Sequence, residues 1–344
     1  MKRKALAIVG CGAVTQRCHV PALALQDRMY LAAVVDTDLR RCEEVIHEYR
    51  RACGGSEPVA MASSIEEVAD HVEAALIAAP HRYHAGLTVD LLERGVACLV
   101  EKTMALTSTE CDQMLRASHS RGALLTAAHV RRLYPGSRFV YELLRAGRLG
   151  AVQAIEWREG TPYDWPLMTA SLFDRELSGG GVLVDVGPHV LDLIGWWLEF
   201  PTPERVEYRD SSRGGVEAEV DLSLRMGGTK VSVQLSRLRL RPNSCRIRGS
   251  NATLVIGIDT PAPYELRGRD GRVIESGIAP ALPPALEGWE TLFAEQLRNF
   301  AAAIDGEEAV HCPGAEAARS VSLIEQCYLS RTALDVSWRD HVEL

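Results

Sequence analysis

The sequence predicts an α/β protein with two parts: an N-terminal doubly wound parallel sheet, and an α+β region with a large, mostly antiparallel open sheet. Up to about residue 125, short apolar runs alternate with amphipathic segments. This pattern is typical of parallel strands covered by helices on both faces. After about residue 130 the apolar runs lengthen and alternate with polar residues. That alternation favours an antiparallel or mixed sheet with one solvated or partner-covered face.

Each element of the first region follows from its local pattern. Continuous apolar runs predict five strands: Ala5–Val9, Leu31–Val35, Ala74–Ala78, Ala97–Val100 and Ala123–Ala127. Helical spacing predicts five helices: Ala22–Asp27, Leu39–Ala52, Ser64–His71, His84–Arg94 and Ser108–Ser120. We place Ser108 as the N-cap of the last helix and Gly122 as its stop, because these residue types favour those positions.

The second region is predicted in the same way. Alternating runs indicate strands at Val152–Trp157, Ala218–Leu224, Lys230–Leu235, Ser244–Arg248 and Thr253–Ile256, with turns at Asn251 and Gly271 and a loop at Ala279–Pro284. Helices are expected at Ser137–Ala146 (ending at Gly147), Gly181–Leu198, Gly288–Ile304 and Ala315–Leu334. We expect domains at residues 1–127 and 128–344, with the last helix, about 315–334, packing back on the first domain.

Composition limits the function classes. The chain has 344 residues, 47% of them hydrophobic, and a formal net charge of −8. Nucleic acid is therefore not expected as a partner, because phosphate backbones require a basic face. No apolar run reaches the roughly 18 residues of a membrane span, and no secretory signal is visible. The nine cysteines include no C-x-x-C pair, which favours free thiols in the reducing cytoplasm.

A glycine motif follows the first strand. Gly10 permits a tight turn, and Gly12 lets the backbone approach a pyrophosphate at the N-terminus of the next helix, which Ala13 and Val14 open. Thr15 stands at the third position of the fingerprint, where glycine or alanine is usual. The motif predicts a Rossmann domain that binds a dinucleotide.

Asp36 ends the second predicted strand. A carboxylate there accepts hydrogen bonds from a ribose 2′-OH and repels a 2′-phosphate, so NAD(H) is favoured. Arg40 and Arg41 follow closely and keep NADP(H) possible, because an arginine can hold that phosphate. A plain turn aspartate is the alternative interpretation.

Two further segments follow parallel strands. Ala79-Pro80, with His84, comes after the third strand, and Glu101-Lys102 after the fourth. Ligands bind at the carboxyl edge of such sheets, where Lys102 would meet a bound nicotinamide. A partly desolvated lysine there can exchange protons. A solvated surface lysine is the alternative.

Asp185 and His189 are spaced i, i+4 after the flexible Gly179-Gly180-Gly181. On one helix both would project from the same face, where they could orient and deprotonate a substrate hydroxyl. Asp192 continues that face. A structural pair is the alternative, and no metal is expected because no third ligand is apparent.

A loop at 160–166 contains Tyr163 and Trp165. A ring for stacking beside polar groups suits a sugar. An ordinary interface or core loop is an equally good interpretation.

These segments together resemble the glucose–fructose oxidoreductase/inositol dehydrogenase family, often called Gfo/Idh/MocA, over nearly the whole chain. The matching pieces, in the family's order, are Gly10-Cys11-Gly12 with Gln16 and His19-Val20-Pro21-Ala22-Leu23; Asp36; Pro80 and His84; Glu101-Lys102; Arg132 and Pro135; and Gly180 to His189.

The resemblance implies an NAD(P)-dependent oxidoreductase that moves hydride to or from a ring carbon of a sugar, sugar derivative or cyclitol. Lys102 and His189 would be the catalytic proton-handling residues, with Asp185 positioning the substrate or the histidine. Gly10, Gly12, Ala13, Val14, Asp36, Ala79, Pro80, His84, Glu101 and Lys102 would contact the cofactor; Arg132, Tyr163, Trp165 and Asp192 would contact the substrate.

The chain departs from the family pattern at Thr103, where the family has proline, at His81, where asparagine is common, and at Thr15. Two alternatives share the fold: a non-catalytic NAD(P)-binding regulator, and a hydride-cycling enzyme that cleaves glycosides without net redox change. We also expect a homodimer or homotetramer, because an open second-domain sheet would leave an apolar face needing cover.

Overall fold

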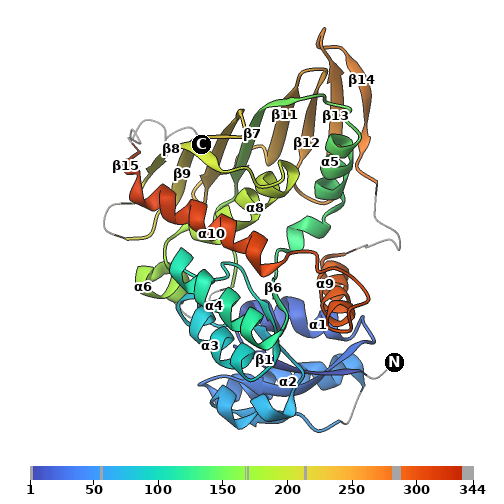
Figure 1. Cartoon of the computed structure of the whole chain (residues 1–344), viewed down its shortest axis with the longest axis vertical. Helices are drawn as coiled ribbons and strands as arrows, with labels where there is room; N and C mark the ends of the chain where they lie inside the picture. Colours follow the sequence, from blue (N-terminus) through green and yellow to red (C-terminus); the bar gives the residue numbers. More distant parts are fainter. Residues whose placement is uncertain are drawn as a thin grey trace. The chain divides into compact units, whose positions relative to one another are not determined.

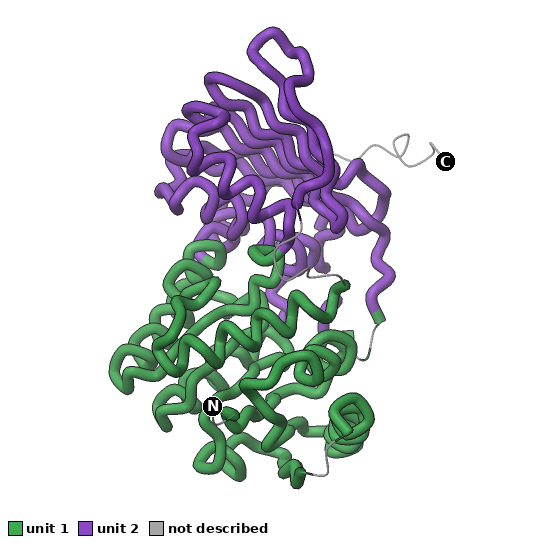
Figure 2. Tube along the Cα trace, turned by 90° about the vertical axis from the view of Figure 1, so that its right-hand side faces the viewer, with its two compact units in different colours: residues 1–133, 166–170, 281–321 green, residues 134–165, 171–280, 322–344 purple. Residues whose placement is uncertain are grey.

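The structure is a computed structural model that describes residues 3–54, 57–166, 168, 170–212, 215–280 and 288–334. The chain forms two compact units (Figure 2). Unit 1 contains residues 1–133, 166–170 and 281–321, and unit 2 contains residues 134–165, 171–280 and 322–344. The predicted domain boundary at 127/128 stays a prediction.

Unit 1 is built on a six-stranded parallel sheet in the order β3-β2-β1-β4-β5-β6. Its strands are β1 (Lys4–Val9), β2 (Met29–Val35), β3 (Ala60–Ala62), β4 (Ala74–Ile77), β5 (Ala97–Val100) and β6 (Leu125–Ala127). The five predicted strands are confirmed. The three-residue edge strand β3 was not predicted, because its run is too short to stand out.

The helical segments of unit 1 are a π-helical turn (Thr15–His19), α1 (Val20–Leu23), α2 (Leu39–Cys53), α3 (His81–Glu93), α4 (Ser108–Arg121), α9 (Trp289–Ile304) and 3₁₀ turns at Ile65–Glu67, Ala69–His71 and Val130–Leu133. Three predictions were wrong in detail. The first helical segment ends at Leu23, not Asp27. Residues 64–71 form two 3₁₀ turns. Thr107, not Ser108, caps α4, because its hydroxyl accepts from the Glu110 amide in a capping box. Gly122 ends α4 as predicted, with a φ of 64°.

Unit 2 contains a nine-stranded sheet in the order β14-β13-β12-β11-β7-β10-β9-β8-β15. Its strands are β7 (Val152–Gly160), β8 (Pro203–Asp210), β9 (Glu219–Met226), β10 (Thr229–Ser236), β11 (Ser244–Gly249), β12 (Ala252–Gly257), β13 (Pro263–Gly268), β14 (Val273–Ile278) and β15 (Arg331–Ala333). The β7–β10 and β8–β15 pairs are parallel and the others antiparallel. The mostly antiparallel open sheet is thus confirmed.

The remaining helices are α5 (Pro135–Arg145), a 3₁₀ turn (Ala170–Phe173), α6 (Arg175–Ser178), α7 (Val182–Asp185), α8 (Gly187–Trp197) and α10 (Gly314–Leu329). The single helix predicted over 181–198 was wrong. It breaks at Val186, and the helical segments on either side are bent by 49°. Pro188 causes the break, because it has no N–H to donate and its ring crowds the preceding turn.

Helices α5 and α8 lie against one face of the unit 2 sheet (Figure 1). Together with α7 they supply apolar side chains to the core of this unit. Trp157 of β7 and Trp197 of α8 meet there with ring centroids 6.0 Å apart. Among the described residues, no single helix is long and apolar enough to cross a membrane. The two helical segments 175–185 and 187–197 together have the required length and composition, but they are bent at the break between them.

Candidate active site

The glycine loop after β1 has two glycines with different roles. Gly10 has a φ of +98°, and a Cβ there would lie 2.5 Å from the Ala78 carbonyl oxygen, so this position needs glycine for packing. A Cβ on Gly12 would meet nothing within 4 Å, which leaves open space beside its backbone. The buried Thr15 donates its hydroxyl to the Gly10 carbonyl at 2.6 Å. The unusual third fingerprint residue therefore braces the loop.

Asp36 connects the end of β2 to this loop. One carboxylate oxygen accepts from the Cys11 amide at 2.8 Å, and the other accepts from the Asp38 amide at 2.9 Å. Arg40 makes two hydrogen bonds of 3.1 Å to Asp38, so its guanidinium is engaged by that neighbouring carboxylate. A carboxylate with two backbone partners is fixed in place and keeps lone pairs for a ribose hydroxyl.

Glu101 lies buried directly before Lys102. Its Oε1 lies 2.8 Å from Nε2 of His19, which is fully buried, and its Oε2 accepts from the Lys102 amide at 3.1 Å. Burial alone would raise the pKa of Glu101, but the hydrogen bond and charge of His19, with Lys102, outweigh it and lower the pKa. Glu101 is therefore an ionised group inside the unit.

His84 contacts the same segment from α3. Its Nδ1 lies 2.8 Å from the Thr103 carbonyl oxygen, and its Nε2 lies 2.7 Å from that of Ala79. Burial lowers the pKa of His84, against the opposing effect of the two carbonyls. The Lys102–Thr103 peptide is cis. The segment that carries Lys102 is thus held on both sides by buried histidines.

The sheet order brings four of these segments to one edge. Strands β2, β1, β4 and β5 are adjacent and parallel, so Asp36, the Gly10 loop, Ala79-Pro80 and Lys102 all follow carboxyl ends. The chain order reverses between β1 and β4. Such a switch point is where open α/β sheets bind ligands.

In unit 2, Asp185 forms an ion pair with Arg237, which follows β10. The Arg237 guanidinium also lies 5.8 Å from the centre of the Tyr163 ring. Burial, then the charge of Asp185, raises the pKa of Tyr163 to about 12, against the opposing charge of Arg237. Asp185 and Tyr163 therefore both contact the same side chain, that of Arg237.

Glu217 fixes the start of α7. Its Oε1 accepts from the amides of Gly181 at 2.9 Å and Leu183 at 3.0 Å, and from the Tyr328 hydroxyl at 2.9 Å. A Cβ on Gly180 would overlap that hydroxyl, and one on Gly181 would overlap the Glu217 backbone. The two glycines are required by this packing. Burial raises the pKa of Glu217, although these hydrogen bonds oppose it.

The other predicted residues are distributed as follows. His189 lies in the first turn of α8 and Asp185 at the end of α7, so they do not share one continuous helix. Asp192 is fully buried in α8. Arg132 is buried in unit 1, where it donates to the His311 carbonyl at 2.9 Å and pairs with Glu316. Trp165 is half-buried. Lys102 belongs to unit 1, and Asp185 and His189 belong to unit 2.

Sequence reasoning did not find the partners of these residues. Arg237 and Glu217 lie far from Asp185 in the sequence, and no local pattern points to either. The pairing of His19 with Glu101 was also not predicted, although a histidine and a glutamate that both belong to the family pattern are a signal for an ion pair.

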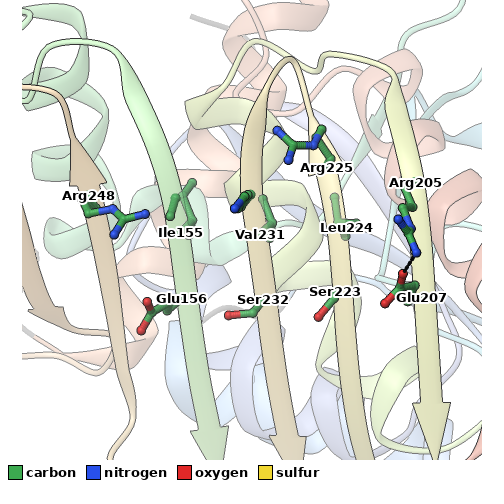
Figure 3. Close-up of a pocket in the computed structure, with 12 residues that line it drawn as sticks. Ile155, Glu156, Arg205, Glu207, Ser223, Leu224, Arg225, Val231, Ser232 and Arg248 are labelled. Atoms are coloured by element: carbon green, nitrogen blue, oxygen red, sulfur yellow. Dashed lines mark ion pairs between the residues drawn. The ribbon is translucent and has the colours of Figure 1, made fainter.

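The open face of the unit 2 sheet is charged, which corrects our expectation of an apolar face. A cavity of about 470 Å³ on it is lined by side chains from β7 to β11 (Figure 3). Four lining residues are basic, namely Arg205, Arg225, Lys230 and Arg248, and two are acidic, Glu156 and Glu207. Arg205 pairs with Glu207. Outward positions of these strands carry charge because the apolar positions face the helices.

Comparison with known proteins gives two family matches. Residues 4–129 match the model described as "Oxidoreductase family, NAD-binding Rossmann fold", and residues 137–255 match the "GFO/IDH/MocA C-terminal domain". Among curated proteins, the chain is 26% identical to D-glucoside 3-dehydrogenase of Escherichia coli over 62% of its own length and 59% of the relative's. It thus spans less than two thirds of that relative. It is 28% identical to scyllo-inositol 2-dehydrogenase (NADP(+)) of Bacillus subtilis, over 81% and 84%.

Solved structures share the fold. Aldose-aldose oxidoreductase from Caulobacter crescentus has a TM-score of 0.81 and 21% identity, covering 96% of this chain and 97% of that one. A 3-ketoreductase from Actinomadura kijaniata, in complex with NADP and TDP-benzene, has a TM-score of 0.81 and 19% identity, covering 98% and 100%. With both family models matched in order, the chain belongs to the Gfo/Idh/MocA family of oxidoreductases, with an NAD-binding Rossmann domain.

Proposed function

We propose that this protein is an NAD(P)-dependent oxidoreductase that transfers hydride to or from a ring carbon of a sugar, sugar derivative or cyclitol. One observation carries the proposal. The glycine loop, Asp36 and Lys102 follow adjacent parallel strands at the switch point of the unit 1 sheet. A lysine at that edge stands where the reacting end of a dinucleotide would be expected.

The residues at this edge fit a dinucleotide. Open space beside Gly12 leaves room for a pyrophosphate, and the Asp36 carboxylate is fixed at the end of β2 for a ribose hydroxyl. NAD(H) is favoured because Asp36 would repel a 2′-phosphate and Arg40 is engaged by Asp38. Ala13, Val14, Ala79 and Pro80 would line the same site. When bound, the nicotinamide supplies or accepts the hydride.

The chain's own groups would handle the proton. Lys102 would hydrogen-bond the reacting oxygen, and His189 would act as general acid or base, since imidazole exchanges protons near neutral pH. Asp185, held by Arg237, would orient the substrate or the histidine. Tyr163 and Trp165 would supply ring faces for the substrate, with Arg132 and Asp192 as further polar contacts.

The proposed substrate class is supported by the names of relatives. They include D-glucoside 3-dehydrogenase, scyllo-inositol 2-dehydrogenase and a 3-ketoreductase. The first two names describe oxidation at one carbon of a glycoside or a cyclitol, and the third describes reduction of a ketone.

The test is a panel of aldoses, glycosides and cyclitols, assayed with NAD⁺ and NADP⁺ by absorbance at the wavelength of the reduced cofactor. We expect stoichiometric cofactor reduction with at least one member. Cofactor binding without turnover on the whole panel would favour a regulator. Glycoside cleavage with only catalytic amounts of NAD⁺ would favour the hydride-cycling alternative.

We also propose a cytoplasmic homodimer or homotetramer assembled through the unit 2 sheet. The open face carries both charge signs around its cavity, so two copies could pair opposite charges across it. Sedimentation at micromolar concentration should show an oligomer, and Arg225→Glu with Lys230→Glu should weaken it. A wild-type monomer would contradict the proposal.

A further inference from the structure

Lys102 sits in a segment whose main chain is fixed on both sides. On one side, the Lys102 amide donates to Glu101 Oε2 at 3.1 Å. On the other, the Thr103 carbonyl lies 2.8 Å from His84 Nδ1. An ionised Glu101 carboxylate without a partner would cost free energy, because a charge buried in an apolar interior loses its hydration.

His19 is that partner. Its Nε2 lies 2.8 Å from Glu101 Oε1, and its ring is fully buried in the π-helical turn that follows the glycine loop. Nδ1 of His19 is buried and has no hydrogen-bond partner among the residues that the structure describes. The edge of the ring packs on Phe293 of α9, with centroids 5.1 Å apart and an interplanar angle of 89°. Nε2 is therefore the ring nitrogen through which His19 donates to the Glu101 carboxylate.

We infer that His19 is a positioning residue that acts through Glu101 to hold the Lys102 main chain in its working place. Glu101 then helps to hold Lys102 in place. The inference rests on the proposed role of Lys102 in proton handling. It links the turn after the glycine loop to the lysine segment after β5 by one continuous path: His19 Nε2, the Glu101 carboxylate and the Lys102 amide.

The chemistry of the two atoms suggests a matched pair of variants. His19→Leu removes the donor and keeps apolar volume. His19→Gln places an amide nitrogen near the position of Nε2 and restores a donor to Glu101. Phe293→Leu removes the ring contact with His19 while leaving the hydrogen bond, and so controls for lost packing.

The experiment measures kcat from about pH 6 to about pH 9, together with the dissociation constant of NAD(H), for these variants and for Lys102→Ala. Misplacement of a reacting group by about 1 Å costs up to about 100-fold in rate. We expect His19→Leu to lose kcat on that scale with unchanged NAD(H) affinity, and His19→Gln to recover most of it. Phe293→Leu should lose much less.

The pH dependence gives a readout that a purely structural role would not move. Without His19, only Lys102 opposes the effect of burial, so the pKa of Glu101 rises. At low pH the protonated Glu101 then accepts only a weaker, uncharged hydrogen bond from the Lys102 amide. The titratable groups that face Glu101 are His19, Lys102, His84 and Cys18. The His19→Leu defect should therefore shrink as pH rises.

Three results separate the outcomes. Near-normal kcat in His19→Leu with an inactive Lys102→Ala overturns the inference and leaves the proposed function standing. The inference is also overturned if His19→Leu lowers only the affinity for NAD(H). It is likewise overturned if His19→Gln does not recover the kcat that His19→Leu loses. Full activity of Lys102→Ala overturns the proposed function itself. If His19→Leu fails to fold, the pH dependence of kcat in His19→Gln tests the inference. This pH dependence must match that of the wild type.

Discussion

Arg237 forms an ion pair with Asp185 while its guanidinium lies 5.8 Å from the centre of the Tyr163 ring. An aspartate that must orient a substrate hydroxyl needs a fixed position and a retained charge, and a half-buried arginine supplies both. Asp185 ends α7, so its position depends on this contact more than on a continuing helix.

Arg237→Met should therefore impair catalysis more than folding. We expect kcat/KM to fall by up to about 100-fold with a small change in melting temperature. Arg239→Met is the matched control, because Arg239 pairs with the buried Glu219. It should cost stability on the order of 1–3 kcal/mol, with little effect on turnover. Equal kinetic defects in the two variants would argue against a special role of Arg237.

The two glycines of the first loop should respond in opposite ways to alanine. Gly10→Ala forces a side chain onto a φ of +98° and against the Ala78 carbonyl, so it should destabilise the protein by about 1–3 kcal/mol or more. Gly12→Ala meets no atom within 4 Å and should leave stability unchanged while weakening cofactor binding. Urea unfolding and cofactor titration measure the two effects. Normal cofactor affinity in Gly12→Ala would mean that no pyrophosphate lies beside this glycine.

Asp36 should set the cofactor preference. Asp36→Asn keeps an acceptor for one of the Cys11 and Asp38 amides but removes the charge that repels a 2′-phosphate. We expect the ratio of NADP(H) to NAD(H) affinity to rise, as measured by titration with each cofactor. An unchanged ratio would assign Asp36 to the turn alone.

Glu217 should make folding stability depend on pH. Burial raises its pKa in the folded state above the ordinary value of 4.5, so as pH rises past 4.5 the unfolded chain loses this proton first. The contribution of Glu217 to stability is therefore present below pH 4.5 and is lost as pH rises to the folded-state pKa. Glu217→Gln keeps an oxygen for the Gly181 and Leu183 amides and cannot ionise. Its unfolding free energy, measured between about pH 4 and about pH 8, should decline less with pH than that of the wild type. A parallel decline would exclude Glu217 as the source.

Much of the fold was predictable because it depends on local pattern. Strands β1, β4 and β5 of unit 1 are buried on both faces and form continuous apolar runs, whereas β14 is almost wholly exposed and has no such signal. β8 was missed because its alternation is mainly of charged residues. The break at Val186 had a signal, Gly187-Pro188, that the i, i+4 spacing of Asp185 and His189 obscured.

The positions of Gly10, Asp36 and Lys102 after strand ends were predictable, because each follows a continuous apolar run. The side chains that hold the candidate site residues in place were not predictable. The partner of Glu101 is 82 positions away, and Arg237 is 52 positions from Asp185. Such pairs are created by tertiary packing, and no periodicity in the sequence encodes them.

The most direct test of the account is single-turnover hydride transfer, followed through the reduced cofactor, in the wild type, Lys102→Ala and His189→Ala with saturating cofactor and a substrate found in the panel. Removing an acid–base group typically costs about 10²–10⁴-fold. We expect losses of that size in both variants, with cofactor binding retained. Hydride transfer at near wild-type rates in both variants would contradict it.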